Sequence, residues 1–429
     1  MRKLLLASAA SMGALLAATS GAMAQPAKPV APGTVAVHLN GYLQFAIGAV
    51  GGNGMTGGTG ATAYKLSPVG TIGDVRLYPG VDGMTENGIA YGAQVELRTT
   101  TSNAGKGVNN NTANSSGTSV NSIYVRRAYG YLGTTEFGYV RFGQTDGAFT
   151  LLQRGVIEAF GDGAQWTAEG APVNLLPSGA PGQFIYADQG ALYTTDKLVY
   201  ISPAVAEPVL NGKFSAVVSF EPNSNGIKEG YANLTSIYGA QASSIAGGSN
   251  TRRRNTFDGM VNYGVNLGGF ATQVSGGYLA SSPLGNIGAA QGYSSMGVFQ
   301  AGAQTTYGGL TVGANLKSGS VEDGYAFKPR GGRNALAYTV GAVYAVGPYS
   351  VGASYFNSQT SGGWTSGGTT ARTLSEYGFA TGANYAVAKP VSLFVEYMYG
   401  HAHQPGNVKL STKGNTQAQV VAAGATIKW

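Results

Sequence analysis

Alternation of apolar and polar residues with a period of two is the feature of this sequence that most restricts its fold. The apolar face of one such segment, residues 349–356, carries Tyr349, Val351, Ala353 and Tyr355. Residues 88–100 and 391–400 repeat the pattern, with single charged residues on the polar face. Successive side chains of a β-strand point to opposite sides, so this period predicts strands with two different surroundings. Because the polar face consists mainly of Gly, Ser, Thr, Asn and Gln, it is typical of strands between lipid and a wet lumen.

The composition supports membrane strands over the other common classes. Charged residues make up only 10% of the chain, whereas about 25% is usual for soluble domains. After residue 24 no apolar run reaches the roughly 20 residues that a membrane helix needs. The chain has 69 Gly, 26 Tyr and no Cys. This combination argues against a cytosolic enzyme, a helical membrane protein and a disulfide-stabilised secreted domain.

The first 24 residues have the pattern of a cleaved export signal. Arg2 and Lys3 precede an apolar run over 4–18, and the small-x-small sequence of residues 22–24 predicts cleavage before Gln25. A signal anchor is the alternative. The prediction is therefore a signal peptide over 1–24 and a single β-barrel domain over 25–429.

Sixteen segments have the alternating pattern, an even number as single-chain bacterial barrels require. They are 35–47, 74–82, 88–100, 122–133, 136–146, 197–202, 214–221, 254–266, 269–280, 295–307, 309–318, 335–346, 349–357, 373–387, 391–400 and 416–429.

The connections between these segments alternate in length. Short ones, such as 133–135, 267–269, 307–309, 347–348 and 388–390, follow one strand of each pair, and long Gly/Asn/Ser/Thr-rich stretches follow the other. Outer-membrane barrels have short periplasmic turns and long extracellular loops. With the N-terminus in the periplasm, all eight long loops fall outside, which predicts localisation in the cell outer membrane.

The last predicted strand continues to the end of the chain and finishes in Trp429. A final strand with a terminal aromatic residue resembles the signal that the barrel assembly machinery reads. Most proteins with this signal end in Phe, so Trp429 is a mild departure that keeps the aromatic ring.

Four sequence segments resemble the general-diffusion porins of Gram-negative bacteria. They are Arg76-Leu77-Tyr78-Pro79-Gly80, residues 91–96, residues 126–133 and residues 137–144; the last two match an Arg-x-Ala-aromatic-x-Gly strand followed by a Phe-Gly-x-x-Arg-x-Gly strand. The resemblance implies an all-β transmembrane antiparallel barrel of 16 strands that assembles as a homotrimer. It also implies a third loop folded into the lumen, and passive diffusion of small hydrophilic solutes and ions through a water-filled channel.

The sequence offers candidates for a pore constriction of that kind. Alternation points Arg76, Arg98, Arg126 and Arg141 into the lumen, since an Arg on the lipid side at mid-membrane costs about 2–4 kcal/mol. The longest connection, 147–196, follows the fifth strand and carries Glu158 and Asp162. Wall arginines facing these loop carboxylates would produce a transverse field that screens solutes by charge and size. A rim or inter-strand ion pair is the alternative for each arginine.

Arg127 departs from this pattern, because strict alternation points it outward. A contact with another subunit or a shifted strand register are the two explanations that the sequence leaves open.

Other functions are weaker alternatives. A substrate-selective channel is one, with Tyr42, Tyr78 and Tyr139 as a sugar track or the arginines favouring organic acids and other anions. A barrel enzyme would need a well-placed base, and the three histidines, His38, His401 and His403, form no convincing set with Ser and an acid. An adhesive barrel with a plugged lumen is the last alternative.

No cofactor, metal or nucleic acid is expected. The G-x-G-x-x-G pattern at 52–57 continues into a loop instead of a helix. The run Arg252-Arg253-Arg254 is interpreted as a rim patch facing solvent or lipopolysaccharide. The expected partners are therefore outer-membrane lipids and lipopolysaccharide, the assembly machinery, and small solutes and ions.

Overall fold

The computed structural model describes residues 30–53, 55–57, 64–65, 67–102, 123–166, 195–223, 244–246, 252–287, 292–362, 373–404 and 415–429. The predicted signal peptide, 1–24, lies outside these residues and stays a prediction.

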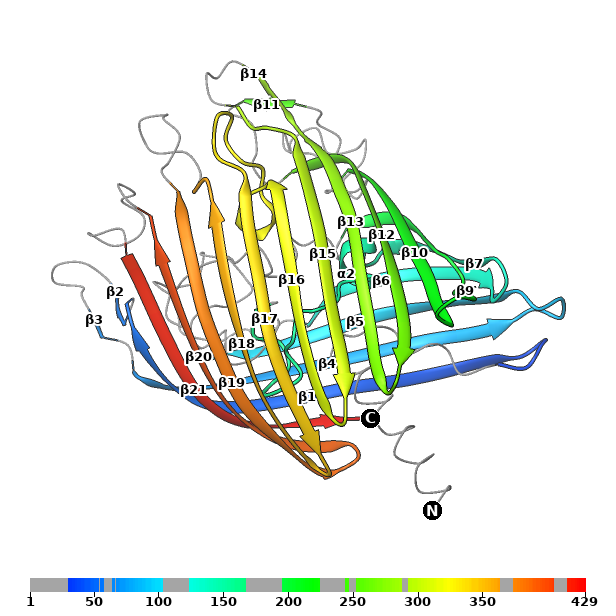
Figure 1. The fold of residues 1–429 in the computed structure, drawn as a ribbon, viewed down its shortest axis with the longest axis horizontal. Helices are drawn as coiled ribbons and strands as arrows, with labels where there is room; N and C mark the ends of the chain where they lie inside the picture. The colour runs from blue at the N-terminus through cyan, green and yellow to red at the C-terminus, as the bar shows by residue number, and fades with distance from the viewer. Residues whose placement is uncertain are drawn as a thin grey trace.

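The described strands form one closed antiparallel barrel (Figure 1). In chain order its strands are β1 (Val35–Gly52), β4 (Val69–Met84), β5 (Ala90–Ser102), β6 (Ile123–Thr134), β7 (Gly138–Gln144), β8 (Asp196–Ile201), β9 (Val205–Glu207), β10 (Gly212–Asn223), β12 (Arg253–Leu267), β13 (Phe270–Pro283), β15 (Met296–Tyr307), β16 (Leu310–Ser320), β17 (Ala335–Val346), β18 (Tyr349–Thr360), β19 (Leu374–Ala388), β20 (Val391–His403) and β21 (Asn415–Lys428). The barrel closes where β1 pairs with β21, from Tyr42 opposite Lys428 to Gly52 opposite Ala418. The short strands β8 and β9 both pair with β10, one after the other along its length. They therefore count as one strand of the barrel, which has 16 strands in all.

The sixteen predicted segments are confirmed, and only their ends move. The largest differences are at the end of β1, which reaches Gly52 instead of residue 47, and at the start of β4, which begins at Val69 instead of residue 74. The ladder between β1 and β4 runs as far as the pair Ala49–Val69. Gly70 and Gly73 interrupt the apolar pattern there, so alternation alone places the start of the strand too late.

The connections are sorted by side, as predicted. Tight turns such as Gly268–Gly269 and Gly308–Gly309 join the strands at one end, and these four glycines have positive φ values of 57°, 90°, 55° and 89°. Glycine is the residue of choice in such hairpin turns. Figure 1 shows these turns and the C-terminus at one end of the barrel, and the strand ends that lead into the long connections at the other.

The outward face has the pattern of a lipid-facing surface. Its middle is aliphatic and accessible, with Val340, Val351 and Val395 exposed by 45%, 54% and 49%. Aromatic pairs flank this band near the short turns, at Phe270–Tyr307, Tyr349–Tyr385 and Phe214–Tyr263. Others flank it near the long loops, at Phe220–Phe257, Tyr338–Tyr355 and Phe379–Tyr397. Two aromatic girdles around an apolar band are typical of outer-membrane barrels.

Among the described residues, no helix combines the length and the apolar character needed to cross a membrane.

Candidate functional site

The connection from β7 to β8, the predicted third loop, enters the barrel directly after β7. Its short helix α2 (Ala148–Leu151) packs against β10, β12 and β13. The Asp258 carboxylate on β12 accepts a hydrogen bond from the Phe149 N–H at 2.9 Å. The Lys197 Nζ on β8 donates to the Thr145 carbonyl at 2.8 Å. Two buried charged groups of the wall therefore fix the root of the loop.

Beyond α2 the loop follows a track of inward-facing glycines across successive strands. These are Gly302, Gly313, Gly341, Gly352 and Gly382 on β15 to β19. A Cβ added at Gly313 would lie 2.8 Å from Ile157 Cδ1, and one at Gly352 would lie 2.5 Å from Phe160 Cδ1. Real Cβ atoms are not found so close to other atoms, so this track needs residues without side chains for the loop to lie against the wall.

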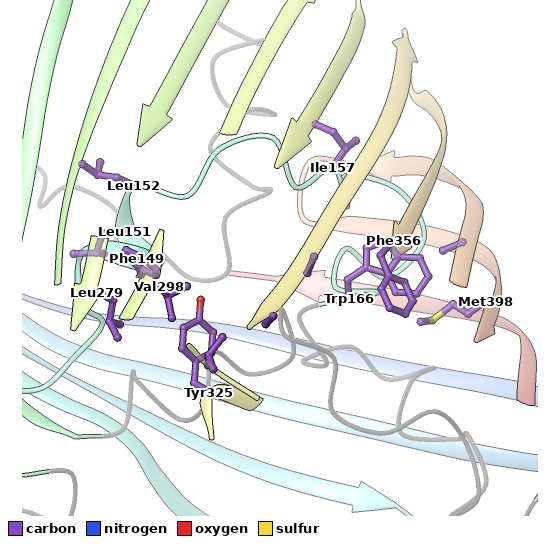
Figure 2. Close-up of a cluster of buried hydrophobic side chains, with 14 of the residues drawn as sticks. Phe149, Leu151, Leu152, Ile157, Trp166, Leu279, Val298, Tyr325, Phe356 and Met398 are labelled. Carbon is purple, nitrogen blue, oxygen red and sulfur yellow. The ribbon is translucent and has the colours of Figure 1, made fainter. Parts of the chain in front are cut away.

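The described end of the loop is held at a second position. The indole of Trp166 donates to Ser354 Oγ at 2.8 Å and packs on Phe356, with 4.6 Å between ring centroids. Figure 2 shows Trp166, Phe356 and Met398 gathered in one apolar group. On β20, the Glu396 carboxylate accepts hydrogen bonds from the Asp162 N–H at 2.8 Å and from the Gln165 amide at 2.9 Å.

A second connection supports α2 from the other side. The turn η4 (Asp323–Tyr325) lies between β16 and β17 and buries Tyr325 completely. In Figure 2, Tyr325 lies beside Leu279 and Val298 of the wall, next to Phe149 of α2. Tyr325 has a positive φ of 55°, a conformation that is strained for a residue with a side chain and persists only where packing compensates.

The third loop therefore covers one side of the lumen. Residues 145–166 contact β10, β12 and β13 at α2, then the glycine track, and finally β20. We call the strands from β12 to β20 the covered wall. The strands from β21 through β1 to β7 carry the predicted arginines, and we call them the arginine wall; β8, β9 and β10 lie between the two walls.

The arginine wall carries a buried ion-pair network centred on Glu96. Its carboxylate, in a side chain 2% exposed, contacts Arg98, Arg127 and, at 3.3 Å, Arg126. Arg127 also pairs with Asp146 at 2.8 Å. A buried carboxylate that accepts from three guanidiniums holds them as one unit, because each charge would be costly to bury alone.

The next strand extends the network. The Arg76 guanidinium contacts Asp74 at 2.5 Å and lies 5.0 Å from the centre of the Tyr42 ring. Lys428 lies on the other side of this ring, with Nζ 5.9 Å from its centre. In the described part of the wall, these contacts join four arginines to the carboxylates of Asp74, Glu96 and Asp146, which leaves positive charge in excess.

The outward orientation that alternation gives Arg127 is wrong. The ladder between β5 and β6 shifts register where Glu96 pairs with Arg127 and the next residue, Leu97, pairs with Val125. Arg126 is the extra residue of a β-bulge, which re-aims side chains by inserting one residue into a strand. Arg126 and Arg127 therefore both reach Glu96 inside the barrel, and the shifted register is the correct one of the two explanations.

The other predicted residues take separate places. Arg141 on β7 faces the lumen, with its guanidinium 5.1 Å from the centre of the Tyr129 ring. Glu158 is buried in the loop, where its carboxylate accepts the Trp166 N–H. Asp162 lies at the described end of the loop, where its N–H donates to the Glu396 carboxylate at 2.8 Å.

The sequence prediction missed the residues that pair with the arginines. Asp74 and Glu96 stand two positions before Arg76 and Arg98 on the same strand face. That spacing was a usable signal, because residues i and i+2 of a strand point the same way. Asp146 offered no comparable signal.

The terminal aromatic residue has a defined position. The backbone of Trp429 exchanges two hydrogen bonds with Gly41, at 3.0 and 3.1 Å, and its ring covers the space where a Cβ of Gly41 would lie. Its role as an assembly signal stays a prediction.

Among the described residues, no group of three or more His, Cys, Asp and Glu side chains is arranged to hold a metal ion.

Comparison with known proteins gives one family and a set of similar folds. A family model described as Gram-negative porin matches residues 7–404. A porin refined at 1.8 Å resolution aligns with this chain at 14% identity and a TM-score of 0.49. The alignment covers 92% of this chain and 100% of that porin. In-vitro folded OmpT of Vibrio cholerae covers 95% of this chain with 100% of its own, at 14% identity and a TM-score of 0.49. A substituted form of the porin of Rh. blastica covers 92% of this chain with 100% of its own, at 13% identity and a TM-score of 0.48.

No curated protein matches the sequence.

Proposed function

Because the chain belongs to the Gram-negative porin family, it is an outer-membrane channel for passive diffusion, and we propose that its passage runs between the third loop and the arginine wall. Small hydrophilic solutes and ions are screened there by size and charge. The family and the fold support a non-enzymatic channel.

The position of the third loop carries this proposal. A 16-stranded barrel is too wide for its own side chains to fill and leaves an aqueous channel. Residues 145–166 narrow that space from one side only, since they lie against the covered wall through α2, the glycine track and Glu396. The passage is then bordered by the loop and by the strands that carry Arg76, Arg98, Arg126 and Arg141.

The charges on the two borders support a transverse field. The arginine wall has excess positive charge in its described part, and the loop carries Asp162. Fixed charges close to a narrow passage act strongly on solutes in it. We expect a modest preference for anions, because the paired carboxylates of the wall offset most of the arginine charge.

The outward face supports a homotrimer. The two girdles described above are built from residues of β10 and of β12 to β20. Toward the long loops, β4 and β6 instead present aliphatic side chains such as Val69, Ile123 and Val125, exposed by 55%, 71% and 51%. An aromatic girdle marks contact with lipid headgroups, so its absence among the described side chains of this stretch favours contact with another copy. One of the structural neighbours, OmpT, was solved in a trimer form.

The remaining partners follow from the surface. The lipid-facing band and its girdles fit outer-membrane lipids and lipopolysaccharide. The assembly machinery would bind the strand that ends in Trp429 before β21 pairs with β1, because Trp429 packs on Gly41 in the closed barrel.

Conductance across planar bilayers tests the proposal. The purified, folded protein is expected to give discrete conductance steps. In a salt gradient, its reversal potential is expected to have the sign of a channel that is more permeable to anions than to cations. Arg98→Gln is expected to move that potential toward cations, and Glu86→Gln in an exposed turn is the matched control. Folded protein that gives no steps would contradict the channel, and equal effects of the two substitutions would contradict the field.

A further inference from the structure

Arg141 differs from the other arginines of its wall. Within the described part of the chain, no carboxylate lies at ion-pairing distance from its guanidinium, whereas Arg76, Arg98, Arg126 and Arg127 each have one. Arg141 is also partly exposed on the lumen side of β7. Its packing on Tyr129, at 5.1 Å, is the contact that holds it. A guanidinium held without a counterion keeps its donors available for an anion.

Three tyrosines surround this cation. Tyr131 pairs with Arg141 across β6 and β7, and Tyr139 stands two residues before it on the same face. The rings of Tyr131 and Tyr139 meet edge to face, with centroids 6.3 Å apart. Tyr129 completes the group under the guanidinium.

The hydroxyls of two of these tyrosines are already engaged. The Tyr129 hydroxyl donates to Gln94 at 2.7 Å, and the Tyr131 hydroxyl donates to Asp82. These bonds fix the rings of Tyr129 and Tyr131 and leave their faces and edges, not their hydroxyls, for a solute. A neutral sugar needs several hydrogen-bonding groups along its edge, and this site offers one cation and aromatic surface instead.

We propose that Arg141, Tyr129, Tyr131 and Tyr139 form a subsite for aromatic carboxylates on the short-turn side of the arginine network. The carboxylate pairs with the Arg141 guanidinium, which matches it with two parallel hydrogen bonds. The aromatic ring of the solute packs against the tyrosines, in the offset or edge-to-face arrangements that such rings prefer. The channel then retains small aromatic acids longer than other anions of the same charge. This inference rests on the proposed channel and adds a preferred solute class to it.

Block of single-channel current by defined solutes tests the subsite. Benzoate is expected to reduce the chloride current at lower concentration than cyclohexanecarboxylate, acetate or neutral phenol. Arg141→Gln is expected to raise the half-blocking concentration of benzoate about tenfold, the effect of losing one charge-assisted pair. Tyr139→Leu is expected to raise it about threefold, through the lost ring contact.

Two matched variants separate this subsite from general effects. Lys428→Gln removes another lumen cation, one that lies against a single ring, and Tyr349→Leu removes a tyrosine from the lipid face. Both are expected to leave block by benzoate within about twofold of the parent, as for changes outside the contact.

Four outcomes would overturn the subsite. These are equal block by cyclohexanecarboxylate and benzoate, equal block by phenol and benzoate, equal effects of Arg141→Gln and Lys428→Gln, and block by glucose in place of benzoate. Conductance in potassium chloride alone is measured in every variant. Its loss would contradict the channel itself, and its presence with no block by benzoate would contradict only the subsite.

Discussion

The covered wall and the arginine wall belong to the same barrel but use their inward residues in opposite ways. On the covered wall, glycines, polar residues and a few buried charged groups such as Asp258 and Glu396 face inward and hold the third loop, which adds an apolar layer of Phe149, Phe160 and Trp166. On the arginine wall, long charged side chains face inward and pair with one another around Glu96. One wall is rigid because another segment packs on it, and the other because its charges are joined.

This difference explains how a wide barrel can have a defined passage. A loop held only at its ends would pay a large entropic cost to keep one position, so it needs contacts along its length. The glycine track and Asn384, whose amide donates to the Gly161 carbonyl at 2.5 Å, supply them. The opposite wall must keep its charges in place without a covering segment, and buried ion pairs with several partners achieve this.

Glu96→Gln gives the largest expected effect and breaks the arginine wall. The variant leaves Arg98, Arg126 and Arg127 without their shared carboxylate. Removing one partner of a buried ion pair costs about 3–5 kcal/mol. The temperature at which the folded protein loses its compact form in detergent should fall clearly, and Glu86→Gln should leave it unchanged. An equal melting temperature for Glu96→Gln and the parent protein would show that the network does not stabilise this wall.

Gly352→Val tests the covered wall in the same way. The new side chain takes the space of Phe160, and overpacking of this kind costs about 1–3 kcal/mol. The third loop should shift away from β18 into the passage. The single-channel conductance should therefore fall clearly, while the melting temperature of the barrel falls only slightly. Gly264→Val on β12 is the matched control, because a Cβ there meets only Gln273, at 3.9 Å. Equal conductance in the two variants would be incompatible with a loop that lies on the glycine track.

Trp166→Phe sharpens the comparison at the end of the described loop. The substitution keeps an aromatic ring on Phe356 but removes the donor to Ser354. Loss of one buried hydrogen bond costs about 1–3 kcal/mol when its partner stays behind. The open-channel current should become noisier while its mean stays close to that of the parent. The matched variant Ser354→Ala removes the acceptor instead, and if the two variants gave different noise, the hydrogen bond would not be the cause.

How much of this could be predicted from the sequence differs between the two walls. Strand positions, loop sides and the inward orientation of Arg76 and Arg98 follow from a period of two, which any regular strand obeys. The bulge at Arg126 breaks that period and is set by the pairing of β5 with β6. Its effect on Arg127 was therefore inaccessible to alternation.

The path of the third loop was predicted only through the resemblance to a family. A sequence signal for it does exist in the inward glycines of β15 to β19, among them Gly313, Gly341 and Gly352. Each of them taken alone is one of many glycines in the chain. They become informative only when strand register places them side by side, as the pairing of Gly313 with Gly341 does.

Asp323→Asn gives the smallest expected effect and tests how the covered wall depends on pH. Burial raises the pKa of the Asp323 carboxyl well above its usual value, and the nearby carboxylates of Glu376 and Glu322 raise it further. The docked turn η4 therefore binds a proton that the free turn releases. Docking is strongest below the ordinary pKa of an Asp and weakens as the pH rises through the raised pKa of Asp323. Tyr325, held next to α2 by this turn, should be freed more often above the raised pKa of Asp323 than below the ordinary pKa of an Asp.

Hydrogen exchange of the backbone amides of η4 measures this effect, after correction for the intrinsic pH dependence of exchange. The Glu322 N–H donates to the Ala326 carbonyl at 2.9 Å and reports directly on the docked turn. In the parent protein its protection should fall with rising pH, and in Asp323→Asn it should fall less, because burial also raises the pKa of Glu322 in the same turn. Amides in the ladder between β16 and β17 serve as the reference. If protection rose with pH in the parent, the sign of the linkage would be wrong, and the turn would be held by an ionised carboxylate instead of a protonated one.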